Sequence, residues 1–360
     1  MTDKKTATTR IWQDRFGDSR QWMEMVHSRI YNDRDCLTIE ADGNIVSQLL
    51  LRDIDYMHLG RALKATYIYG AATRRDCQHR GYMSELMVKA IRESFSRGAS
   101  VAFLKPAQRW LYDFYAGFGF ATTVYIDEQR YTSAHKFPSP ADQFVIETSV
   151  NDMDELTRSY NNLASLRPST SLHNQVDFMT ILIDNSLDDG VKAVVRNRVD
   201  GGICAIAFAV TDGDGNVAVR DLVASDDISA ELALGGIATQ LPGRSMVVES
   251  TTCYRRAKYE ARGMSRIINV AEFLKALLTV KSDLKLRLRI ADNIIAENNR
   301  VFRVNNGEVK VEQTDHPIGN QRFDLDVDIE VFTSIVFSSP EIGGIFNLPS
   351  ARSFISLMLD

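Results

Sequence analysis

A turn that carries a glycine and several basic side chains lies between residues 71 and 83. It follows an apolar segment typical of a strand, residues 63–73, and opens directly into a helical pattern over residues 81–97. The apolar face of that helix would consist of Met83, Leu86, Met87, Ala90, Ile91 and Phe95. Backbone N–H groups that gather at the start of a helix bind phosphate groups well. The pattern therefore predicts a site for the pyrophosphate of a phosphorylated cofactor.

Two common cofactor motifs do not occur in the chain. There is no G-x-G-x-x-G, which disfavours a dinucleotide, and no G-x-x-x-x-G-K-[ST], which disfavours a P-loop nucleotide. The turn instead contains Gln78-His-Arg-Gly81-Tyr-Met83, and coenzyme A is the third cofactor that a strand, a glycine-bearing turn and a helix could hold. A basic, solvated turn that only caps an amphipathic helix would show the same pattern, so this alternative stays open.

An aromatic segment follows at residues 111–120, and its Tyr115 could act as an acid. An amine that attacks a thioester expels a thiolate, to which a nearby phenol can give a proton. A phenol with a pKa of about 10 and a thiol with a pKa of about 8.5 are close enough for this transfer to be useful. The alternative is that Tyr115 belongs to an aromatic core cluster with Tyr112, Phe114, Phe118 and Phe120.

These motifs resemble signatures of the GNAT family of N-acetyltransferases. The turn resembles Arg/Gln-x-x-Gly-x-Gly/Ala, although Met83 stands where the last small residue is expected. The aromatic segment is similar to the later Tyr-x-x-Phe-Gly-Phe/Tyr motif, with Tyr115 as its tyrosine. A third segment, residues 263–274, resembles the Met-x-Arg-x-x-Asp/Asn-Val junction of the Eis (enhanced intracellular survival) group, in which the last turn position need not be small.

The resemblance to this group covers nearly the whole chain and implies a fold class. It implies an α+β (mixed α/β) protein with two tandem GNAT-like domains followed by a sterol-carrier-protein-like α+β domain. The predicted boundaries are 1–135 for an N-terminal catalytic GNAT domain, 136–268 for a second, degenerate GNAT-like domain and 269–360 for the sterol-carrier-protein-like domain. A Pro/Ser-rich break after residue 135 marks the first boundary. The second GNAT-like domain shows no counterpart of the cofactor turn.

The same resemblance implies the residues of the site. The strand backbone at residues 71–73 would align the cosubstrate acetyl-CoA, and the backbone amides of residues 78–83 would hold its pyrophosphate. Tyr115 would protonate the departing thiolate, and the α-carboxylate of Asp360 would orient the attacking amine. The cofactor-binding residues are therefore expected to be Ala71, Ala72, Thr73, Gln78, His79, Arg80, Gly81, Tyr82 and Met83.

The implied activity is transfer of acetyl from acetyl-CoA to a primary amine of a small molecule or peptide, by direct attack. A homo-oligomer would be consistent with the resemblance. The alternative is a non-catalytic ligand- or lipid-binding protein that uses the sterol-carrier-like domain. The intact turn together with Tyr115 favours the enzyme, because a relic would have little reason to keep both.

The bulk composition limits the partners. The 360 residues suit two or three domains, and 44% hydrophobic with 25% charged residues is ordinary for a globular protein. The net charge of −5 argues against nucleic acid. No apolar run reaches about 18 residues and the N-terminus does not resemble a signal peptide, so we expect a cytoplasmic protein without a membrane segment. The scattered cysteines and histidines predict no metal site.

The last ninety residues show two alternating segments. Leu284–Ile290 alternates apolar with basic residues, and Phe323–Val331 alternates apolar with acidic residues. Both patterns predict half-buried antiparallel strands, and neighbouring polar faces would form cross-strand ion pairs. Asp324, Asp326 and Asp328 could also be read as metal ligands, but a paired or solvated acidic face is favoured. A terminal helix is predicted near residues 349–358.

Overall fold

The computed structural model describes residues 3–243, 245–250, 260–312, 322–337 and 353–355. The chain forms two compact units. The first unit comprises Met1–Val124 and Arg262–Arg352, and the second comprises Tyr125–Ala261 and Ser353–Asp360. The fold is mixed α/β, as the sequence predicts. The three-domain division at residues 135 and 268 stays a prediction.

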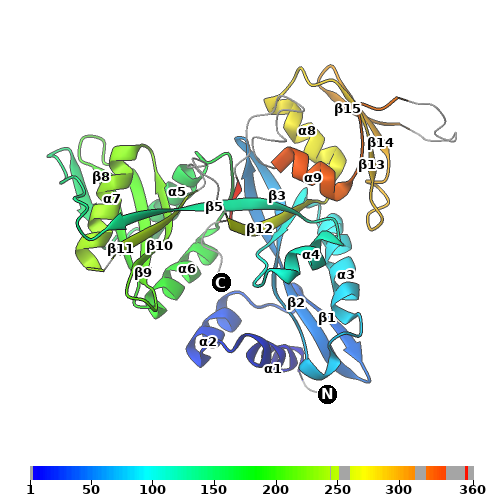
Figure 1. Ribbon diagram of the computed structural model, residues 1–360, viewed down its shortest axis with the longest axis horizontal. Helices are drawn as coiled ribbons and strands as arrows, with labels where there is room; N and C mark the ends of the chain where they lie inside the picture. The colour runs from blue at the N-terminus through cyan, green and yellow to red at the C-terminus, as the bar shows by residue number, and fades with distance from the viewer. Residues whose placement is uncertain (1–2, 244, 251–259, 313–321, 338–352, 356–360) are drawn as a thin grey trace. The chain divides into compact units, whose positions relative to one another are not determined.

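The first unit begins with two helices and a sheet (Figure 1). Its elements up to the first crossing into the second unit are α1 (Lys4–Phe16), α2 (Arg20–Arg29), β1 (Cys36–Ala41), β2 (Asn44–His58), β3 (Arg61–Thr73), the short 3-10 helix η1 (Arg75–Cys77), α3 (Tyr82–Ser96), β4 (Val101–Leu104), α4 (Trp110–Ala116) and the start of β5 (Ala121–Thr132). After the chain returns, the elements are β12 (Glu260–Ile267), α8 (Val270–Val280), β13 (Leu286–Ala291), β14 (Val301–Asn305), β15 (Glu308–Glu312), β16 (Leu325–Asp328) and α9 (Ile329–Phe337).

The main sheet of the first unit has the order β1-β2-β3-β4-β12. Its strands run antiparallel to their neighbours except for β3 and β4, which are parallel and joined through α3. Leu86, Met87, Ala90 and Ile91 of α3 are buried against this sheet. The helical periodicity predicted for residues 81–97 is therefore confirmed, and it places the apolar face of α3 on the core.

The second unit repeats this arrangement. Its elements are the rest of β5, β6 (Phe144–Glu147), α5 (Met153–Ala164), β7 (Ser169–Leu172), α6 (Gln175–Leu187), β8 (Val191–Asn197), β9 (Ile203–Thr211), β10 (Val217–Ala224), α7 (Asp227–Gln240), β11 (Ser245–Ser250) and, near the C-terminus, β17 (Ser353–Phe354). The sheet order is β5-β11-β10-β9-β8-β6. Strands β10 and β11 are parallel and joined through α7, as β3 and β4 are joined through α3.

Both faces of the second sheet are covered. Ala205, Ala207 and Ala209 of β9 face a core that includes α7, whereas Ile206 and Phe208 face the core formed with α5 and α6. Because successive side chains of a strand point to opposite faces, a strand covered on both sides is apolar throughout. Both units thus contain three antiparallel strands followed by a helix and a parallel strand, β1-β2-β3-α3-β4 and β8-β9-β10-α7-β11, and the sequence resemblance predicts tandem GNAT-like domains.

The two units exchange one strand each. Strand β5 follows α4 of the first unit, but its residues 127–132 pair with β11 in the second unit. Strand β12 follows β11 of the second unit, but its residues 264–267 pair with β4 in the first unit. Each sheet is thus completed by a strand that the other half of the chain supplies.

The C-terminal part of the first unit forms a second sheet, β15-β14-β13-β16, with α8 and α9 on one face (Figure 1). Of the two segments predicted as antiparallel strands, β13 is antiparallel to its neighbour β14, whereas the prediction is wrong for β16, which runs parallel to β13. Parallel neighbours need a long connection, because the chain must return to the same end of the sheet. The connection from β13 to β16 includes the β14–β15 hairpin. The predicted cross-strand ion pairing is found between Arg289 and Asp326, at 3.3 Å.

Two predicted elements need correction. The strand predicted over Phe323–Val331 ends at Asp328, because the carboxylate of Asp328 accepts the amide of Val331 at 2.8 Å and so begins α9. Within the helix predicted near 349–358, Ser353 and Phe354 instead form β17, which pairs in parallel with Ser169 and Thr170. Ile355 is in neither a helix nor a strand, and residues 349–352 and 356–358 lie outside the described residues.

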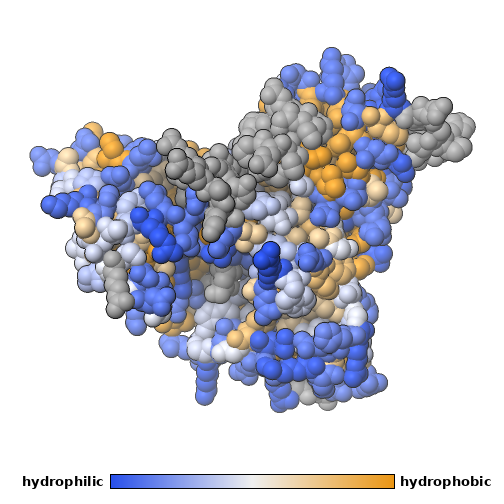
Figure 2. Space-filling model, viewed as in Figure 1, coloured by the Kyte–Doolittle hydropathy of each residue, from blue (hydrophilic) through white to orange (hydrophobic). Residues whose placement is uncertain are grey.

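Hydrophobic surface is visible over the C-terminal elements. Figure 2 shows orange atoms gathered over α8, α9 and the sheet beside them, where Val280, Val311 and Val331 are exposed. The likeness of this region to sterol carrier proteins stays a prediction. In the described part of the chain, no helix is both long and apolar enough to span a bilayer.

Candidate functional site

Strands β3 and β4 pair over only part of their length. Their register runs from Ala65–Val101 to Tyr67–Phe103, while β3 continues to Thr73. On its other edge, β3 stays paired with β2 as far as Thr73–Ser47. Beyond Tyr67, β3 therefore has one edge whose backbone groups are not paired with β4.

The direction of the backbone groups at the end of β3 can be assigned. The amide of Arg74 donates to the carbonyl of Val46, and the carbonyl of Ala72 accepts from the Ser47 hydroxyl, so both face β2. Because backbone groups alternate in direction along a strand, those of Ala71 and Thr73 face the opposite edge. The predicted residues Ala71 and Thr73 thus present donors and acceptors on the unpaired edge, and Ala72 is buried between them.

A β-bulge shapes this part of β3. The register with β2 shifts between Gln48 and Leu50, opposite Gly70, whose φ is +59°. A Cβ at Gly70 would lie 1.9 Å from the Trp12 ring, so only glycine fits here. The Gln48 side chain donates to the Gly70 carbonyl at 2.9 Å and fixes the bulge.

The turn between β3 and α3 exposes several backbone amides. His79 has a φ of +61° and Gly81 a φ of +84°, and α3 begins at Tyr82. Among the described residues, no side chain caps this helix, and its first intrahelical bond runs from Glu85 N to Gly81 O at 3.0 Å. The amides of Tyr82, Met83 and Ser84 precede that bond and have no acceptor within the helix. Amides of this kind at a helix start favour an anion, and the pyrophosphate site expected at residues 78–83 stays a prediction.

The basic residues of the turn are not equivalent. Arg74 is paired with Asp76 at 2.6 Å, and Arg75 is paired with Asp14 at 3.0 Å. Arg80 is exposed and has no carboxylate partner in the part of the chain that the structure describes. Arg80 is therefore the cation of this turn whose charge is not already compensated.

Tyr115 lies near the C-terminal end of α4 and is 7% exposed. Its ring contacts those of Phe114 and Phe120, with centroids 5.2 and 6.2 Å away. Burial raises the pKa of Tyr115 to about 12. Burial is also the main reason why the pKa of Tyr67 is raised, and the phenols of Tyr69 and Tyr115 add to that rise.

The predicted residue Asp360 lies outside the described residues, so its role stays a prediction. The nearest described residues are held in the second unit. Phe354 belongs to β17, and its ring centre is 4.3 Å from the Arg167 guanidinium. Arg167 in turn pairs with the buried Asp221, which also accepts the Tyr160 hydroxyl at 2.6 Å.

A buried ion pair stands out that the sequence reasoning did not assign. Arg266 of β12 and Asp292 both have side chains that are 0% exposed, and Arg266 Nη2 lies 2.8 and 2.9 Å from the two carboxylate oxygens. Arg266 belongs to the segment that resembles the Eis-type junction, and in that segment Asn269 caps α8 by accepting the Glu272 amide at 3.1 Å. An arginine flanked by apolar residues within a strand was the available signal for such a pair.

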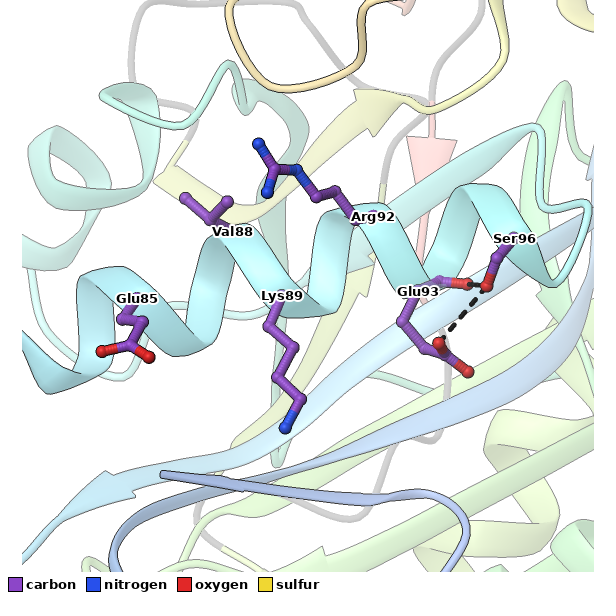
Figure 3. Close-up of a pocket in the computed structure, with 6 residues that line it drawn as sticks. All are labelled: Glu85, Val88, Lys89, Arg92, Glu93 and Ser96. Carbon is purple, nitrogen blue, oxygen red and sulfur yellow. Dashed lines mark hydrogen bonds between the residues drawn. The ribbon is translucent and has the colours of Figure 1, made fainter. Parts of the chain in front are cut away.

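A shallow groove follows the outward face of α3. Figure 3 shows the six side chains that line it, which are Glu85, Val88, Lys89, Arg92, Glu93 and Ser96. None of them belongs to residues 71–73 or 78–83, so the groove is distinct from the cofactor turn. Among the described residues, no cluster of three or more His, Cys, Asp and Glu side chains could hold a metal ion.

Comparison with known proteins finds a family match for the N-terminal third of the chain. Residues 2–123 match the family described as acetyltransferase (GNAT) domain. The chain contains a GNAT acetyltransferase domain. Its limits enclose β3, the cofactor turn, α3, β4 and Tyr115. This match over residues 2–123 supports acyl transfer in general. A comparison with curated proteins found no match.

Solved structures extend the likeness beyond the GNAT domain. A GCN5-related N-acetyltransferase from Anabaena variabilis is 15% identical with a TM-score of 0.74, covering 93% of this chain and 88% of its own. A probable N-acyltransferase from Enterococcus faecalis is 12% identical with a TM-score of 0.76, covering 96% and 90%. Eis1 from Mycobacterium abscessus is 13% identical with a TM-score of 0.71, covering 94% and 88%. At these identities the likeness concerns the fold.

Proposed function

We propose that this chain is an acetyl-CoA-dependent N-acetyltransferase that acts on a primary amine of a small molecule or peptide. The observation that carries the proposal is the combination of the unpaired edge of β3, the uncapped start of α3 and the buried Tyr115 within one GNAT domain. Such a combination provides a groove edge for an extended arm, an anion site and a proton donor. The three features match the three chemical parts of acetyl-CoA: pantetheine, pyrophosphate and thioester.

The cosubstrate would be held mainly by backbone. The groups of Ala71 and Thr73 on the unpaired edge of β3 would pair with the amides of the pantetheine arm, as another strand would. The amides of residues 78–83 would hold the pyrophosphate at the start of α3, and Arg80 would add a positive charge. Backbone recognition explains why Met83 can replace a small residue, because its amide rather than its side chain is used.

Tyr115 would act on the leaving group. Acetyl-CoA supplies the thioester, and attack by the neutral amine forms a C–N bond and releases a thiolate once the C–S bond breaks. The amine loses a proton and the sulfur gains one, so the reaction needs a donor beside the sulfur. With a pKa of about 12, Tyr115 stays protonated at neutral pH and donates a hydrogen bond to the developing charge. Because a thiol has a pKa of about 8.5, full transfer of this proton to the thiolate is uphill, so Tyr115 would act chiefly by hydrogen bonding to the sulfur as its negative charge builds up.

The terminal carboxylate is the second catalytic group we propose, on the basis of the Eis-like sequence resemblance. An α-carboxylate with a pKa of about 3.5 is a weak base, so its role would be to orient the ammonium or amine electrostatically. Deleting Asp360 alone should lower kcat for amine acetylation by about tenfold or more, since a misplaced nucleophile reacts slowly. The deletion moves the α-carboxylate by one residue, and full turnover in that variant would remove Asp360 from the mechanism.

Acetyl-CoA binding to the native chain is the decisive test, measured by calorimetry beside two glycine variants. Gly81→Asp puts a carboxylate at the start of α3 and should weaken binding by about tenfold or more through charge repulsion. Gly98→Asp is the matched control, because Gly98 also has a left-handed φ (+77°) and open space around it, but lies after α3 ends. Binding that Gly81→Asp does not weaken more than Gly98→Asp would contradict the proposed pyrophosphate site.

Turnover is then followed by release of free thiol with a panel of amines. Polyamines, aminoglycosides, lysine peptides and peptide N-termini cover the small-molecule and peptide classes. If the native chain binds acetyl-CoA but none of these amines leads to thiol release, the result would favour the alternative, a non-catalytic ligand-binding protein. A homo-oligomer, which the sequence resemblance suggests, would be tested by sedimentation of the same preparation.

A further inference from the structure

The buried ion pair of the first unit has a fixed geometry. Arg266 Nη1 donates to the Ile267 carbonyl at 2.9 Å, while Nη2 reaches both oxygens of Asp292. Burial lowers the pKa of Arg266, and the Asp292 carboxylate opposes that effect. Burying an ion pair costs desolvation free energy, so the pair need not stabilise the fold. Its role is better inferred from the groups that it contacts.

Asp292 is itself held from several sides. Its Oδ1 accepts the amides of Ile294 and Ile295 at 2.9 and 3.1 Å, and its Oδ2 accepts Asn298 Nδ2 at 3.0 Å. Asn298 also donates to the Ile268 carbonyl at 2.8 Å and accepts the Val270 amide at 3.0 Å. The network closes on the chain around β12, so the Arg266 guanidinium has little freedom to move.

The remaining donor of Arg266 reaches the turn after Tyr115. Arg266 Nε donates to the Phe118 carbonyl at 2.8 Å. The amides of Phe118 and Phe120 both return to the carbonyl of Tyr115, at 2.9 and 3.3 Å. The turn that Arg266 contacts is therefore hydrogen-bonded to the backbone carbonyl of Tyr115 itself.

The same turn has no room to shift toward Arg266. Gly119 has a φ of +81°, and a Cβ there would lie 3.1 Å from Arg266 Nε and 2.6 Å from the γ2 methyl of Ile329. The backbone at Gly119 thus lies directly against the guanidinium and against α9. Both contacts come from the chain that follows the second unit, far from Tyr115 in sequence.

We propose that Arg266 is a positioning residue that sets Tyr115 for its role as proton donor, acting through the Phe118 carbonyl and the Gly119 turn. The inference rests on the proposed function for its catalytic meaning. Asp292 fixes Arg266, Arg266 fixes the turn, and the turn fixes the backbone that carries the phenol. The C-terminal part of the first unit is in this way a component of the acid machinery.

Arg266→Lys is the variant that tests the geometry. Lysine keeps a positive charge for Asp292 but lacks the planar guanidinium that reaches Asp292 and Phe118 together. We expect kcat to fall by about tenfold to a hundredfold, as for a displaced catalytic group, with KM for acetyl-CoA within about twofold. The matched control is Arg97→Lys, since Arg97 is 6% exposed and binds Asp35, Asp53 and Glu93 in the same unit. Arg97→Lys should cost stability without this selective loss of kcat.

A double-mutant cycle separates positioning from general structural damage. In a Tyr115→Phe background, Arg266→Lys should cause no further loss of kcat, because the group it positions is already gone. Losses that multiply would overturn the proposal, since Arg266 would then act by another route.

A readout that needs no turnover keeps the inference separable from the proposed function. With 3-fluorotyrosine incorporated, the ¹⁹F resonance that disappears in Tyr115→Phe reports on the phenol. Arg266→Lys should shift or broaden that resonance, and Arg97→Lys should not. If the native protein is inactive but Arg266→Lys still shifts the Tyr115 resonance, only the proposed function is overturned. If the native protein is active but Arg266→Lys leaves the resonance unmoved, only the positioning role is overturned.

Should Arg266→Lys fail to fold, Ile329→Ala carries the same test. It removes the methyl group beside Gly119 without touching a charge. The Tyr115 resonance should again move, and an unchanged resonance in a folded Ile329→Ala protein would contradict the proposed rigidity of the turn.

Discussion

The two units use the same strand–helix–strand arrangement but begin their helices differently. In the first unit, the turn from Arg74 to Gly81 separates β3 from α3, and in the described structure no side chain caps the helix. In the second unit, Asp226 caps α7, with its carboxylate accepting the Ser229 amide at 2.8 Å. That hydrogen bond is the main reason why the pKa of Asp226 is lowered. The second unit thus places its own carboxylate at a helix start whose counterpart in the first unit has no side-chain cap and is where we propose that the pyrophosphate binds.

The gap between the parallel strands does not distinguish the units. Strand β10 pairs with β11 only from Val217 to Val219, although it continues to Ala224. Both units therefore have a parallel pair that separates, as β3 and β4 do. One capping carboxylate can occupy the start of a helix while the strand geometry around it stays the same. Function therefore has to be inferred from the residues of the site and not from the fold.

Among the variants that compare the two units, removal of the Tyr115 hydroxyl should have the largest effect on kcat. Tyr115→Phe should lower kcat by about a hundredfold to a thousandfold, the usual contribution of a proton donor, and leave acetyl-CoA affinity within about twofold. Tyr160→Phe is the control in the second unit, where the hydroxyl binds Asp221 and should matter for stability only. Equal kcat losses in the two variants would mean that Tyr115 serves packing.

The pH dependence should reflect the same phenol. Since burial raises the pKa of Tyr115 to about 12, its ionisation should not limit kcat in the neutral and mildly alkaline range. A kcat profile that falls with an apparent pKa near 10 in the native protein, and loses this limb in Tyr115→Phe, would show a phenol that is less buried than described.

Removing the cap of α7 should have an intermediate effect. Asp226→Ala should lower the free energy of unfolding by about 1 kcal/mol at neutral pH, as loss of an N-cap usually does. The folded-state pKa of Asp226 is depressed, so its stabilisation is present above the unfolded value of about 4 and is lost as the pH falls through the folded value. Urea unfolding at pH 7 and pH 3 should show the difference between the two proteins shrinking in acid. A difference that does not depend on pH would contradict the charged cap.

The smallest effect should come from the charge of the cofactor turn. Arg80→Ala should weaken acetyl-CoA binding by about threefold, more at low salt than at high salt, because an exposed charge near a helix start contributes only modestly. Arg74→Ala should have less effect, since Arg74 is already paired with Asp76. Calorimetry at two salt concentrations checks both, and a larger loss for Arg74 would reverse the assignment.

Local patterns in the sequence predicted most elements well. The periodicity of residues 81–97 and the apolar segment at 63–73 correspond to α3 and β3. A period of about 3.6 residues places the apolar side chains on one face only if the segment is a helix. Residues 323–331 were harder, since their alternation suits a strand and only the carboxylate of Asp328 ends it. Helices α1 and α7 were not predicted, and α7 has no strongly one-sided apolar pattern to reveal it.

The site was predictable where it depends on backbone and less so where it depends on distant contacts. The turn residues 78–83 follow from one glycine and one helix start. Pairing partners such as Arg266 with Asp292 are set by the path of the chain, which no local window contains. For the same reason the parallel direction of β13 and β16 could not be read from their alternating residues.

The strand exchange has a consequence for the order in which the protein can be made. Strand β4 is apolar at all four positions, and the edge that faces β12 stays without this partner until residues 264–267 have been synthesised. A nascent chain that has released only the GNAT domain therefore presents an apolar strand edge, which is a template for aggregation. This edge stays open for as long as translation of the whole second unit takes, so the exchange makes completion of the first sheet depend on synthesis of the second unit.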